Sequence, residues 1–498
     1  MRDTTGETDL SHRLDSLFSP RSVAIIGASS IFGKWGFNIL SRLLRNRDAR
    51  QVYAVNRKET EILGLPAYPT VHDVPGPVDL AVITVPAQQL AGVIQDCIRK
   101  EVKIAVIISS GLAETGDEGA RVEKDIVRIA REGGLRFVGP NCLGHFNTYS
   151  NIYTVPFMPR VVRGEVALIS QSGNSSQSVF NYGMQMGLGF SEFVSSGNEA
   201  DIRFEDYLEY FARDRKTKLI LGYVEGLRDG RRFFELAKEI TKKKPIIIMK
   251  AGRTDAGSRA ARSHSASLAG SDAVLDAAFK QCGVIRAQEL GELVDIAVAL
   301  LGQPLPRGRR VGVLAMGGGP AVMAADALRR EGLQLPELTS DTMARLNALL
   351  SSRWSHGNPV DPAGDFVSYH CIWPLIEDAN TDAVMTIGGI GMTDSFSGWA
   401  QIPDDLKADA LKFRQAMEDA ELENLDKTTH LMEQYGKPLV IATMVTGALR
   451  EGKIMRRLKN RHMKNYTSPE KAARVLARLA DYSEYLAAAR NHPRPPQR

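Results

Sequence analysis

The chain has 498 residues, of which 43% are hydrophobic and 24% charged, and its formal net charge is +5 at pH 7. This composition is typical of a globular protein, and the length predicts about three domains. The mild charge and the lack of a long Lys/Arg run argue against a nucleic-acid-binding protein.

The N-terminus and the cysteines predict a cytoplasmic protein. Residues 1–19 mix acidic, basic and hydroxyl side chains, which is not the pattern of a signal peptide. No stretch has the ~18 consecutive apolar residues of a membrane helix, so we expect no membrane association. The four cysteines form no CxxC pair, so we expect a reducing compartment and no metal site or disulfide framework.

The first part of the chain alternates buried strands with helical stretches. Continuous runs of β-branched residues predict a parallel, doubly wound sheet, with a helix over about 33–46. The predicted strands are 22–27, 51–56, 80–86, 104–111 and 136–139. They predict a Rossmann-like α/β domain over 18–150, after an N-terminal extension at 1–17.

The same alternation restarts twice. Strands at 164–170, 218–224 and 245–250 predict a second α/β domain over 160–303. A third domain is predicted over 308–487, and a disordered tail over 488–498. Its expected elements are strands at 310–316, 383–387 and 438–442 and a long charged helix at 404–435.

The turn after the first strand predicts an anion-binding site. It runs from Gly27 to Gly36 and departs from the GxGxxG pattern because Ser29 replaces the central glycine. Asn56 stands where an NAD-binding protein carries an acid, and Arg57 and Lys58 follow it. A ligand with a phosphate near its ribose is therefore favoured, and both NADP and coenzyme A remain open.

A similar turn in the second domain predicts a phosphate site at the start of a helix. Ser172, Gly173, Asn174 and Ser175 offer hydroxyls and backbone N–H groups to an anion. A serine hydrolase is disfavoured because the first glycine of GxSxG is missing. The third domain has a weaker candidate at 317–319, where three glycines also suit a plain tight turn.

His264 lies in a loop of small residues that follows the strand at 245–250. Arg253, Arg259 and Arg262 precede it, which suits an anion. A histidine on such a loop is a candidate phosphate carrier, although an incidental surface histidine would read the same way.

Taken together, these motifs resemble the NDP-forming acyl-CoA synthetases over about residues 18–487. This family includes ADP-forming acetate–CoA ligases and is related to succinyl-CoA synthetase. The motifs are Gly27…Gly33, 109–114 (SSGLAE), 139–144 (GPNCLG), 170–173 (SQSG), 196–199 (SGNE), 263–264 (SH), 317–320 (GGGP) and 358–361 (NPVD).

The resemblance implies a fold, a reaction and a set of site residues. The fold would be an N-terminal Rossmann-like CoA-binding domain followed by two flavodoxin-like domains of the succinyl-CoA-synthetase type. His264 would carry a transient phosphoryl group, Glu225 would hydrogen-bond its imidazole, and Ser172–Ser175 would bind phosphate. The expected CoA-binding residues are Gly27, Ser29, Ser30, Gly33, Lys34, Asn56, Arg57, Lys58, Val85, Pro86, Ser109, Ser110, Gly111, Glu114 and Asn141.

The resemblance also implies a partner. No segment after 487 is long enough for an ATP-grasp domain, so ATP or ADP and Mg²⁺ would bind mainly to a separate ATP-grasp beta-type subunit in a hetero-oligomer. The other substrates would be inorganic phosphate and a small carboxylic acid or its acyl-CoA. This chain departs from the family at Ser265-Ala266, where Thr-Gly is usual, and at Ala315-Met316. The alternatives are a CoA-sensing regulatory module, which the presence of His264 disfavours, and an NADP-dependent oxidoreductase.

Overall fold

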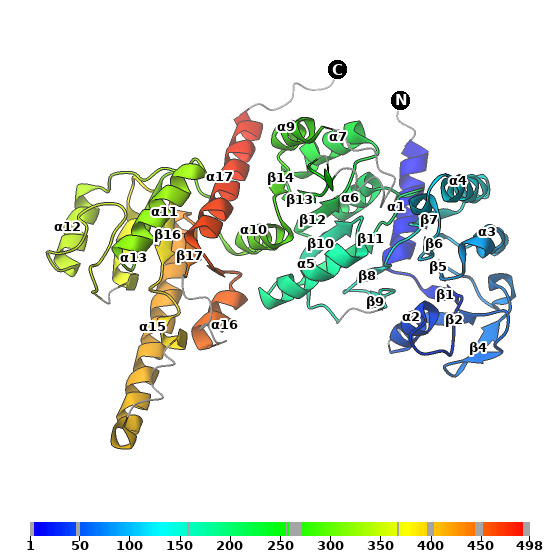
Figure 1. Cartoon of the computed structure of the whole chain (residues 1–498), viewed down its shortest axis with the longest axis horizontal. Coiled ribbons are helices and arrows are strands. Elements are labelled where there is room, and N and C mark those ends of the chain that lie inside the picture. The colour runs from blue at the N-terminus through cyan, green and yellow to red at the C-terminus, as the bar shows by residue number, and fades with distance from the viewer. Residues whose placement is uncertain are drawn as a thin grey trace. The chain divides into compact units, whose positions relative to one another are not determined.

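The computed structural model describes residues 4–45, 50–156, 160–254, 256–257, 271–365, 368–395, 403–443 and 452–491. The chain divides into two compact units, Met1–Leu293 and Val294–Arg498 (Figure 1). The first unit contains two seven-stranded sheets and the second unit one four-stranded sheet. Most strand pairs are parallel, and along the chain most successive strands are connected by helices, which confirms the predicted α/β class.

The first sheet has the strand order β3-β4-β2-β1-β5-β6-β7, and only β3 pairs antiparallel. All residues of β1, β5 and β6 are buried because helices cover both faces. The strands are β1 Ser22–Ile26, β2 Gln51–Val55, β3 Glu61–Ile62, β4 Leu65–Tyr68, β5 Leu80–Ile83, β6 Ile104–Ile107 and β7 Arg136–Val138. β2 and β5 flank β1, so the strand order reverses there, which is where open α/β sheets bind ligands.

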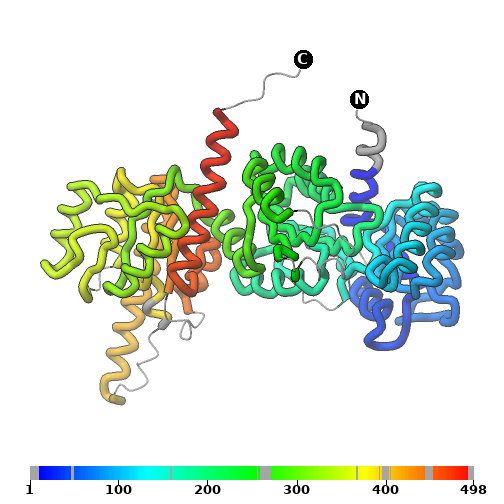
Figure 2. Tube along the Cα trace, turned by 45° about the horizontal axis from the view of Figure 1, so that its top comes forward, coloured from blue at the N-terminus to red at the C-terminus, as the bar shows by residue number. Residues whose placement is uncertain are grey.

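The helices of this half include one at the N-terminus that sequence patterning did not predict. They are α1 Thr4–Phe18, α2 Trp35–Leu44, α3 Leu90–Arg99 and α4 Asp117–Glu132, with short 3₁₀ turns at Val71–Asp73, Ala87–Gln89 and Ala113–Thr115. α1 contacts β6 of the first sheet and β8 of the second. In Figure 2 its blue tube lies between the cyan and the green parts of the first unit. Burial lowers the pKa of His145 to about 3, so its neutral ring donates through Nε2 to the Leu17 carbonyl, 2.8 Å away.

The second sheet has the order β14-β13-β12-β10-β11-β8-β9. Its strands are β8 His145–Asn147, β9 Ile152–Tyr153, β10 Arg163–Ser170, β11 Phe190–Ser195, β12 Leu219–Val224, β13 Ile246–Lys250 and β14 Ile285–Ala287. Its helices are α5 Gly173–Gln185, α6 Phe204–Arg213, α7 Gly230–Ile240 and α9 Asp272–Cys282, and α10 Leu290–Gly302 follows. β8 lies within the predicted 18–150 domain and pairs antiparallel with β11, so this stretch of the chain adds a strand to the second sheet.

The second unit is built on the parallel sheet β15-β16-β17-β18. Its strands are β15 Val311–Ala315, β16 Ala383–Ile387, β17 Leu439–Ala442 and β18 Asn465–Tyr466. Its helices are α11 Gly318–Arg330, α12 Ser340–Leu349, α13 Ser368–Glu377, α14 Met392–Ser395, α15 Lys407–Tyr435, α16 Lys453–Asn460 and α17 Pro469–Asn491, with a 3₁₀ turn at Asp404–Leu406. α15 confirms the long charged helix. The predicted disorder over 488–498 is wrong for 488–491, which belong to α17; residues 492–498 lie outside the described residues.

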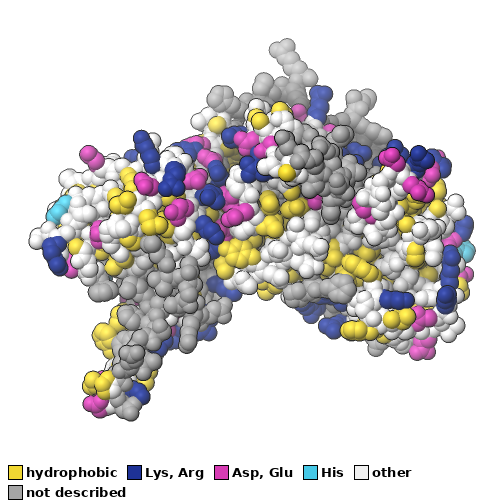
Figure 3. Space-filling view, in the orientation of Figure 1, with side chains coloured by type: hydrophobic (Ala, Val, Ile, Leu, Met, Phe, Trp, Pro, Cys, Tyr) yellow, Lys and Arg dark blue, Asp and Glu magenta, His cyan; other side chains and the backbone are white. Residues whose placement is uncertain are grey.

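The surface carries mixed charges. On the face shown in Figure 3, basic and acidic side chains lie interspersed on each unit. Within the described residues, no helix has the length and apolar content needed to cross a membrane.

Candidate functional site

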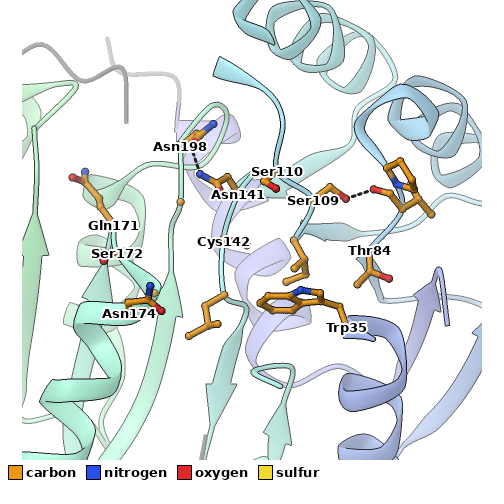
Figure 4. Close-up of a pocket in the computed structure, with 16 residues that line it drawn as sticks. Trp35, Thr84, Ser109, Ser110, Asn141, Cys142, Gln171, Ser172, Asn174 and Asn198 are labelled. Carbon is orange, nitrogen blue, oxygen red and sulfur yellow. Dashed lines mark hydrogen bonds between the residues drawn. The ribbon is translucent and has the colours of Figure 1, made fainter. Parts of the chain in front are cut away.

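A cavity of about 470 Å³ opens in the first unit at the carboxyl ends of strands from both sheets (Figure 4). One side is formed by residues that follow β5, β6 and β7 of the first sheet, and the other by residues that follow β10 and β11 of the second. Its lining includes eight of the predicted site residues: Val85, Pro86, Ser109, Ser110, Asn141, Ser172, Gly173 and Asn174. The structure therefore brings five of the predicted CoA-binding residues and three of the predicted phosphate-binding residues to one cavity.

Two glycines allow the turn after β1 to approach its neighbours closely. Gly27 has φ of 92°, and a Cβ there would lie 2.6 Å from Thr84 Oγ1. A Cβ on Gly36 would lie 2.0 Å from the Gly27 carbonyl oxygen, so only glycine lets α2 pack this close to the turn. Gly33 has φ of 87° and open space around it, so it serves backbone conformation alone.

Side chains of the same turn hold it against the end of β2. Ser29 Oγ accepts from the Ile31 N–H at 3.1 Å, and Asn56 Nδ2 donates to the Ala28 carbonyl at 2.7 Å. The Ser30 N–H donates to the Glu59 carboxylate at 3.2 Å. Sequence reasoning missed Glu59, because it lies outside β2 and reaches the turn only through the loop that follows. These contacts give Ser29 and Asn56 a structural role in the turn.

A second cavity of about 340 Å³ lies at the carboxyl ends of β1 and β2. Gly27, Asn56, Arg57 and Lys58 line it, and Val85 lines both cavities. Both basic side chains are exposed at its rim. The predicted residues Ser29, Ser30, Gly33, Lys34, Gly111, Glu114, Ser175 and Glu225 line neither cavity.

Glu114 instead closes its own loop. Its carboxylate accepts from the Gly111 N–H at 2.6 Å and from Asn198 Nδ2 at 2.8 Å. Burial opposes ionisation, but these hydrogen bonds outweigh it and hold the pKa of Glu114 below its usual value.

Asn198 ties the loop after β11 to loops of the first sheet. Its Nδ2 donates to both Glu114 and Glu123, each at 2.8 Å, and its Oδ1 accepts from Asn141 Nδ2 at 3.3 Å. Its carbonyl accepts from Arg228 at 2.6 Å. The two walls of the larger cavity are thus joined by direct hydrogen bonds.

The turn before α5 forms the phosphate-binding candidate. Ser172 caps the helix and its side chain accepts from the Ser175 N–H at 3.3 Å. The N–H groups of Gly173 and Asn174 belong to the first helical turn, where no helix carbonyl can accept them and the dipole favours an anion. A Cβ on Gly173 would lie 2.8 Å from Leu143 Cβ, so a side chain there would press on the cavity wall.

Gln171 connects this cavity to the loop that carries Glu225. Its Oε1 accepts from the N–H groups of Glu225 and Gly226 at 2.6 and 3.1 Å, and its Nε2 donates to the Gly226 carbonyl at 2.8 Å. Glu225 is buried and directly follows β12. We did not single out Gln171 from the sequence, although it stands next to the predicted Ser172–Ser175 turn.

Beside this loop, Lys250 ends β13 and pairs in register with Val224 of β12. Burial lowers the pKa of Lys250, and the charges of Asp272 and Glu225 partly offset that effect. The loop with His264 follows β13, but residues 258–270, including His264, lie outside the described residues.

Two more buried groups are Cys142, which lines the larger cavity, and Glu199, which follows the lining residue Asn198. Burial raises the pKa of Glu199 to about 7; Ser196 Oγ donates to its Oε1 at 2.7 Å, while its Oε2 has no hydrogen-bond partner. Burial raises the pKa of the Cys142 thiol to about 12, so it stays protonated and is a poor nucleophile. Among the residues described, no group of three His, Cys, Asp or Glu side chains is placed to hold a metal ion.

Trp35 differs from its sequence-based interpretation. From the sequence, Trp35, Phe157 and Met158 are candidates to line a pocket, with core packing the favoured role for each; in the structure Trp35 lines the larger cavity and remains 39% exposed. Its position at the start of α2, directly after the turn, points the indole into the cavity (Figure 4). Phe157 and Met158 lie outside the described residues.

Comparison with known proteins identifies the family. Residues 21–148 match the CoA binding domain family, and residues 163–300 match the succinyl-CoA ligase like flavodoxin domain family. The alpha subunit of ADP-forming acetate–CoA ligase II from Pyrococcus furiosus is 42% identical over 377 residues, which cover 75% of this chain and 82% of that subunit. The alpha subunit of ligase I from the same organism is 38% identical over 95% of this chain and 98% of that subunit.

A solved structure extends the match. Acetyl-coenzyme A synthetase 1 of Ca. Korarchaeum cryptofilum, in complex with phosphate and ADP, superposes with a TM-score of 0.79 at 30% identity, covering 97% of this chain and 99% of that chain. The predicted fold class and the suspected resemblance are both confirmed. The chain therefore belongs to the NDP-forming acyl-CoA synthetase family, in which its relatives include alpha subunits of ADP-forming acetate–CoA ligases.

Proposed function

We propose that the chain is the CoA-binding, phosphohistidine-carrying subunit of an ADP-forming acyl-CoA synthetase. The reaction is acid + CoA + ATP ⇌ acyl-CoA + ADP + phosphate. The observation that carries the proposal is the single cavity that joins the turn before α5 to the loops after β5, β6 and β7. The alpha-subunit names of the relatives support the assignment of a partner-dependent ligase.

In this proposal, CoA extends across both cavities of the first unit. Its phosphate-bearing nucleotide end would lie in the smaller cavity, where Arg57 and Lys58 supply positive charge. Its pantetheine arm would pass Val85, which lines both cavities, and its thiol would lie near Ser109 in the larger one. Gly27 and Gly36 permit the close backbone approach on which this path depends.

The proposed chemistry is a relay of one phosphoryl group. In the direction of ATP formation, a phosphate oxygen attacks the thioester carbonyl carbon, the C–S bond breaks and CoA leaves as a thiolate that takes up a proton. His264 Nε2 then attacks phosphorus, and the carboxylate of the acid leaves. The phosphohistidine finally passes its phosphoryl group to ADP, and all steps run in reverse for acyl-CoA synthesis.

Two groups of this chain would support the relay. The Ser172–Ser175 turn would hold the phosphoryl oxygens with its backbone N–H groups. Glu225 would accept from Nδ1–H of His264, which fixes the tautomer that leaves Nε2 free. The position of Glu225 after β12, next to the strand β13 that leads into the His264 loop, is consistent with this role.

ATP or ADP and Mg²⁺ would bind mainly to a separate ATP-grasp beta-type subunit in a hetero-oligomer. We retain the division into domains at 18–150, 160–303 and 308–487 as part of the proposal, with β8 and β9 packed on the second sheet. The third domain carries a glycine turn, 317–319, at the start of α11, and we assign it no catalytic role.

Radiolabelling tests the proposal directly. The chain, mixed with its ATP-grasp partner and γ-labelled ATP, should take up acid-labile, base-stable phosphate, and His264→Ala should abolish the label. Equal labelling of His264→Ala would refute the phosphocarrier role. Calorimetry on the full chain should detect CoA binding; binding of NADPH in place of CoA would support an oxidoreductase instead.

A further inference from the structure

An ion pair joins the two flanks of the segment that contains His264. The described residues end at 257 and resume at 271, so Arg253 precedes this segment and Asp272 follows it. Arg253 Nε lies 3.6 Å from Asp272 Oδ2. The two flanks are therefore connected to each other by side chains as well as by the segment itself.

Both members of this pair are also held by the end of the second sheet. Asp272 is the first residue of α9, and its Oδ1 pairs with the guanidinium of Arg286 on β14, which is only 8% exposed. Arg253 donates to Gln288 Oε1, directly after β14. Arg286 pairs in addition with Asp276 of α9 at 3.3 Å, and that contact by itself attaches the helix to the sheet. The pair of Asp272 with Arg253 has the further effect of linking α9 to the chain that leaves β13.

The ion pair lies on the same side of the sheet as Glu225. β14, β13 and β12 are neighbouring strands, and Lys250, at the end of β13, pairs in register with Val224, directly before Glu225. The buried ammonium group of Lys250 interacts electrostatically with both Asp272 and Glu225. The flanks of the His264 segment are thus held beside the carboxylate that would hydrogen-bond its imidazole.

A chain segment with fixed ends reaches fewer positions than one with loose ends. Its effective concentration is therefore higher at a site near those ends, whereas a distant site gains nothing from the restriction. In the proposed reaction His264 serves one site of each kind. The acyl phosphate is beside the Ser172–Ser175 turn of the same chain, and ADP is on the partner subunit.

We infer that Asp272 is a positioning residue: by binding Arg253 across the flanks of the His264 segment, it speeds phosphoryl transfer between acyl phosphate and His264 and does not speed transfer between His264 and ADP. This inference rests on the proposed function. The chemistry of the step is unchanged, because the N–P bond forms as the P–O bond to the leaving carboxylate breaks. Asp272 contacts none of the reacting atoms and acts only through the position of the histidine.

Rapid-quench labelling of the complete two-subunit enzyme measures the two transfers separately. Labelled phosphate, with whichever of acetyl-CoA, isobutyryl-CoA and phenylacetyl-CoA labels the parent fastest, reports the transfer from acyl phosphate. Enzyme that carries label from γ-labelled ATP, when mixed with ADP, reports the transfer to nucleotide. Asp272→Asn should slow the first transfer about fivefold, the upper end for one surface ion pair, and change the second less than about twofold.

Three further variants separate positioning from helix attachment. Arg253→Gln should give the same pattern as Asp272→Asn, and the double variant should be little slower than either, because both changes remove one interaction. Asp272→Glu should recover most of the rate. The matched control is Asp276→Asn, which loses a contact to the same Arg286 one helical turn further from the segment. It should leave both transfers at the parent rate.

Equal slowing of both transfers, or a loss of the same size in Asp276→Asn, would mean that these ion pairs only attach α9 to the sheet, and would overturn the inference. Parent rates for both transfers in Asp272→Asn would overturn it as well. The proposed function fails in a different way: the parent would take up no label from ATP, or none with any of the three thioesters.

Discussion

Gln171 lines the larger cavity and holds the backbone of Glu225 in position, so replacing it tests the arrangement of the site directly. Its side-chain amide makes three hydrogen bonds to the backbone of Glu225 and Gly226. Gln171→Leu keeps the approximate size of the side chain and removes all three. We expect the loop after β12 to lose its register relative to the turn before α5, and transfer of phosphate to His264 to slow.

The magnitude follows from the contacts. A net hydrogen bond contributes about 1 kcal/mol, so three contribute about 3 kcal/mol. Because Gln171 borders an open cavity, water can replace part of that loss, and we expect about 2 kcal/mol to remain. At ~1.4 kcal/mol for each factor of ten, the phosphorylation rate should fall about thirtyfold.

The assay is rapid-quench labelling of the chain with ATP and the partner subunit. Gln171→Leu should label slowly while its CoA dissociation constant stays at the parent value, because Gln171 belongs to the phosphate side of the cavity. Gln185→Leu, at the exposed far end of α5, is the matched control and should label like the parent. A folded Gln171→Leu protein that labels at the parent rate would refute the positioning argument.

Three further predictions concern stability and CoA binding. Gly36→Ala should destabilise the first unit by about 3 kcal/mol and weaken CoA binding, because its Cβ would lie 2.0 Å from the Gly27 carbonyl oxygen. The control Gly92→Ala, on α3, has no atom within 4 Å of the added Cβ and should change neither property. Thermal unfolding measures the stability, and calorimetry measures the CoA binding. Burial raises the pKa of Glu199 from 4.5 to about 7, so the folded state binds the extra proton and stability declines as pH rises from about 4.5 to 7. In urea unfolding, the free energy of unfolding of Glu199→Gln should therefore rise by about 3 kcal/mol relative to that of the parent between pH 4 and pH 8. A difference between the two proteins that does not change with pH would contradict this. Arg57→Gln and Lys58→Gln should each raise the CoA dissociation constant about fivefold, because both residues line the smaller cavity. The increase should be smaller in 0.5 M NaCl, since salt screens the charges. The control Lys124→Gln, at an exposed position, should leave the dissociation constant unchanged.

The strands that sequence reasoning found are predominantly apolar. Apart from Ser22 at the start of β1, the strands β1, β5, β6, β12 and β15 are continuous runs of Val, Ile, Leu, Ala and an occasional Gly or Tyr, and all were predicted. β11, Phe190–Ser195, was missed because it includes Ser191 and Glu192, although all six of its residues are buried. Their polar partners, Thr217 and Asn147, lie far away in sequence, so only the tertiary structure explains the burial.

The candidate site divides in a similar way. Glycine-rich turns after strands were visible in the sequence because backbone conformation restricts those positions. Trp35, Gln171 and Asn198 were not selected as site residues, because their roles depend on contacts that only the folded chain makes. Trp35 faces the cavity, and Gln171 bonds to the loop that carries Glu225. Asn198 bonds to Glu114, Glu123 and Asn141. Conversely, Ser29 and Asn56 were predicted to bind CoA and are engaged in hydrogen bonds within the turn.

The hydrogen bonds of Asn198 concern the two transfer steps of the proposed reaction, acyl transfer and phosphoryl transfer. They tie the loop after β11 to Asn141 and Glu114, so the wall proposed to bind phosphate and the wall proposed to bind CoA are joined directly. Attack of phosphate on a thioester needs the two reactants a few ångströms apart, and a wall held in place provides that without a closing motion. The phosphoryl group, in contrast, would have to leave this cavity to reach ADP on another subunit. Under the proposed function, acyl transfer in a cavity whose walls are hydrogen-bonded to each other and phosphoryl transfer by His264 would meet these two demands separately, and the small residues around His264 in the sequence are consistent with that division.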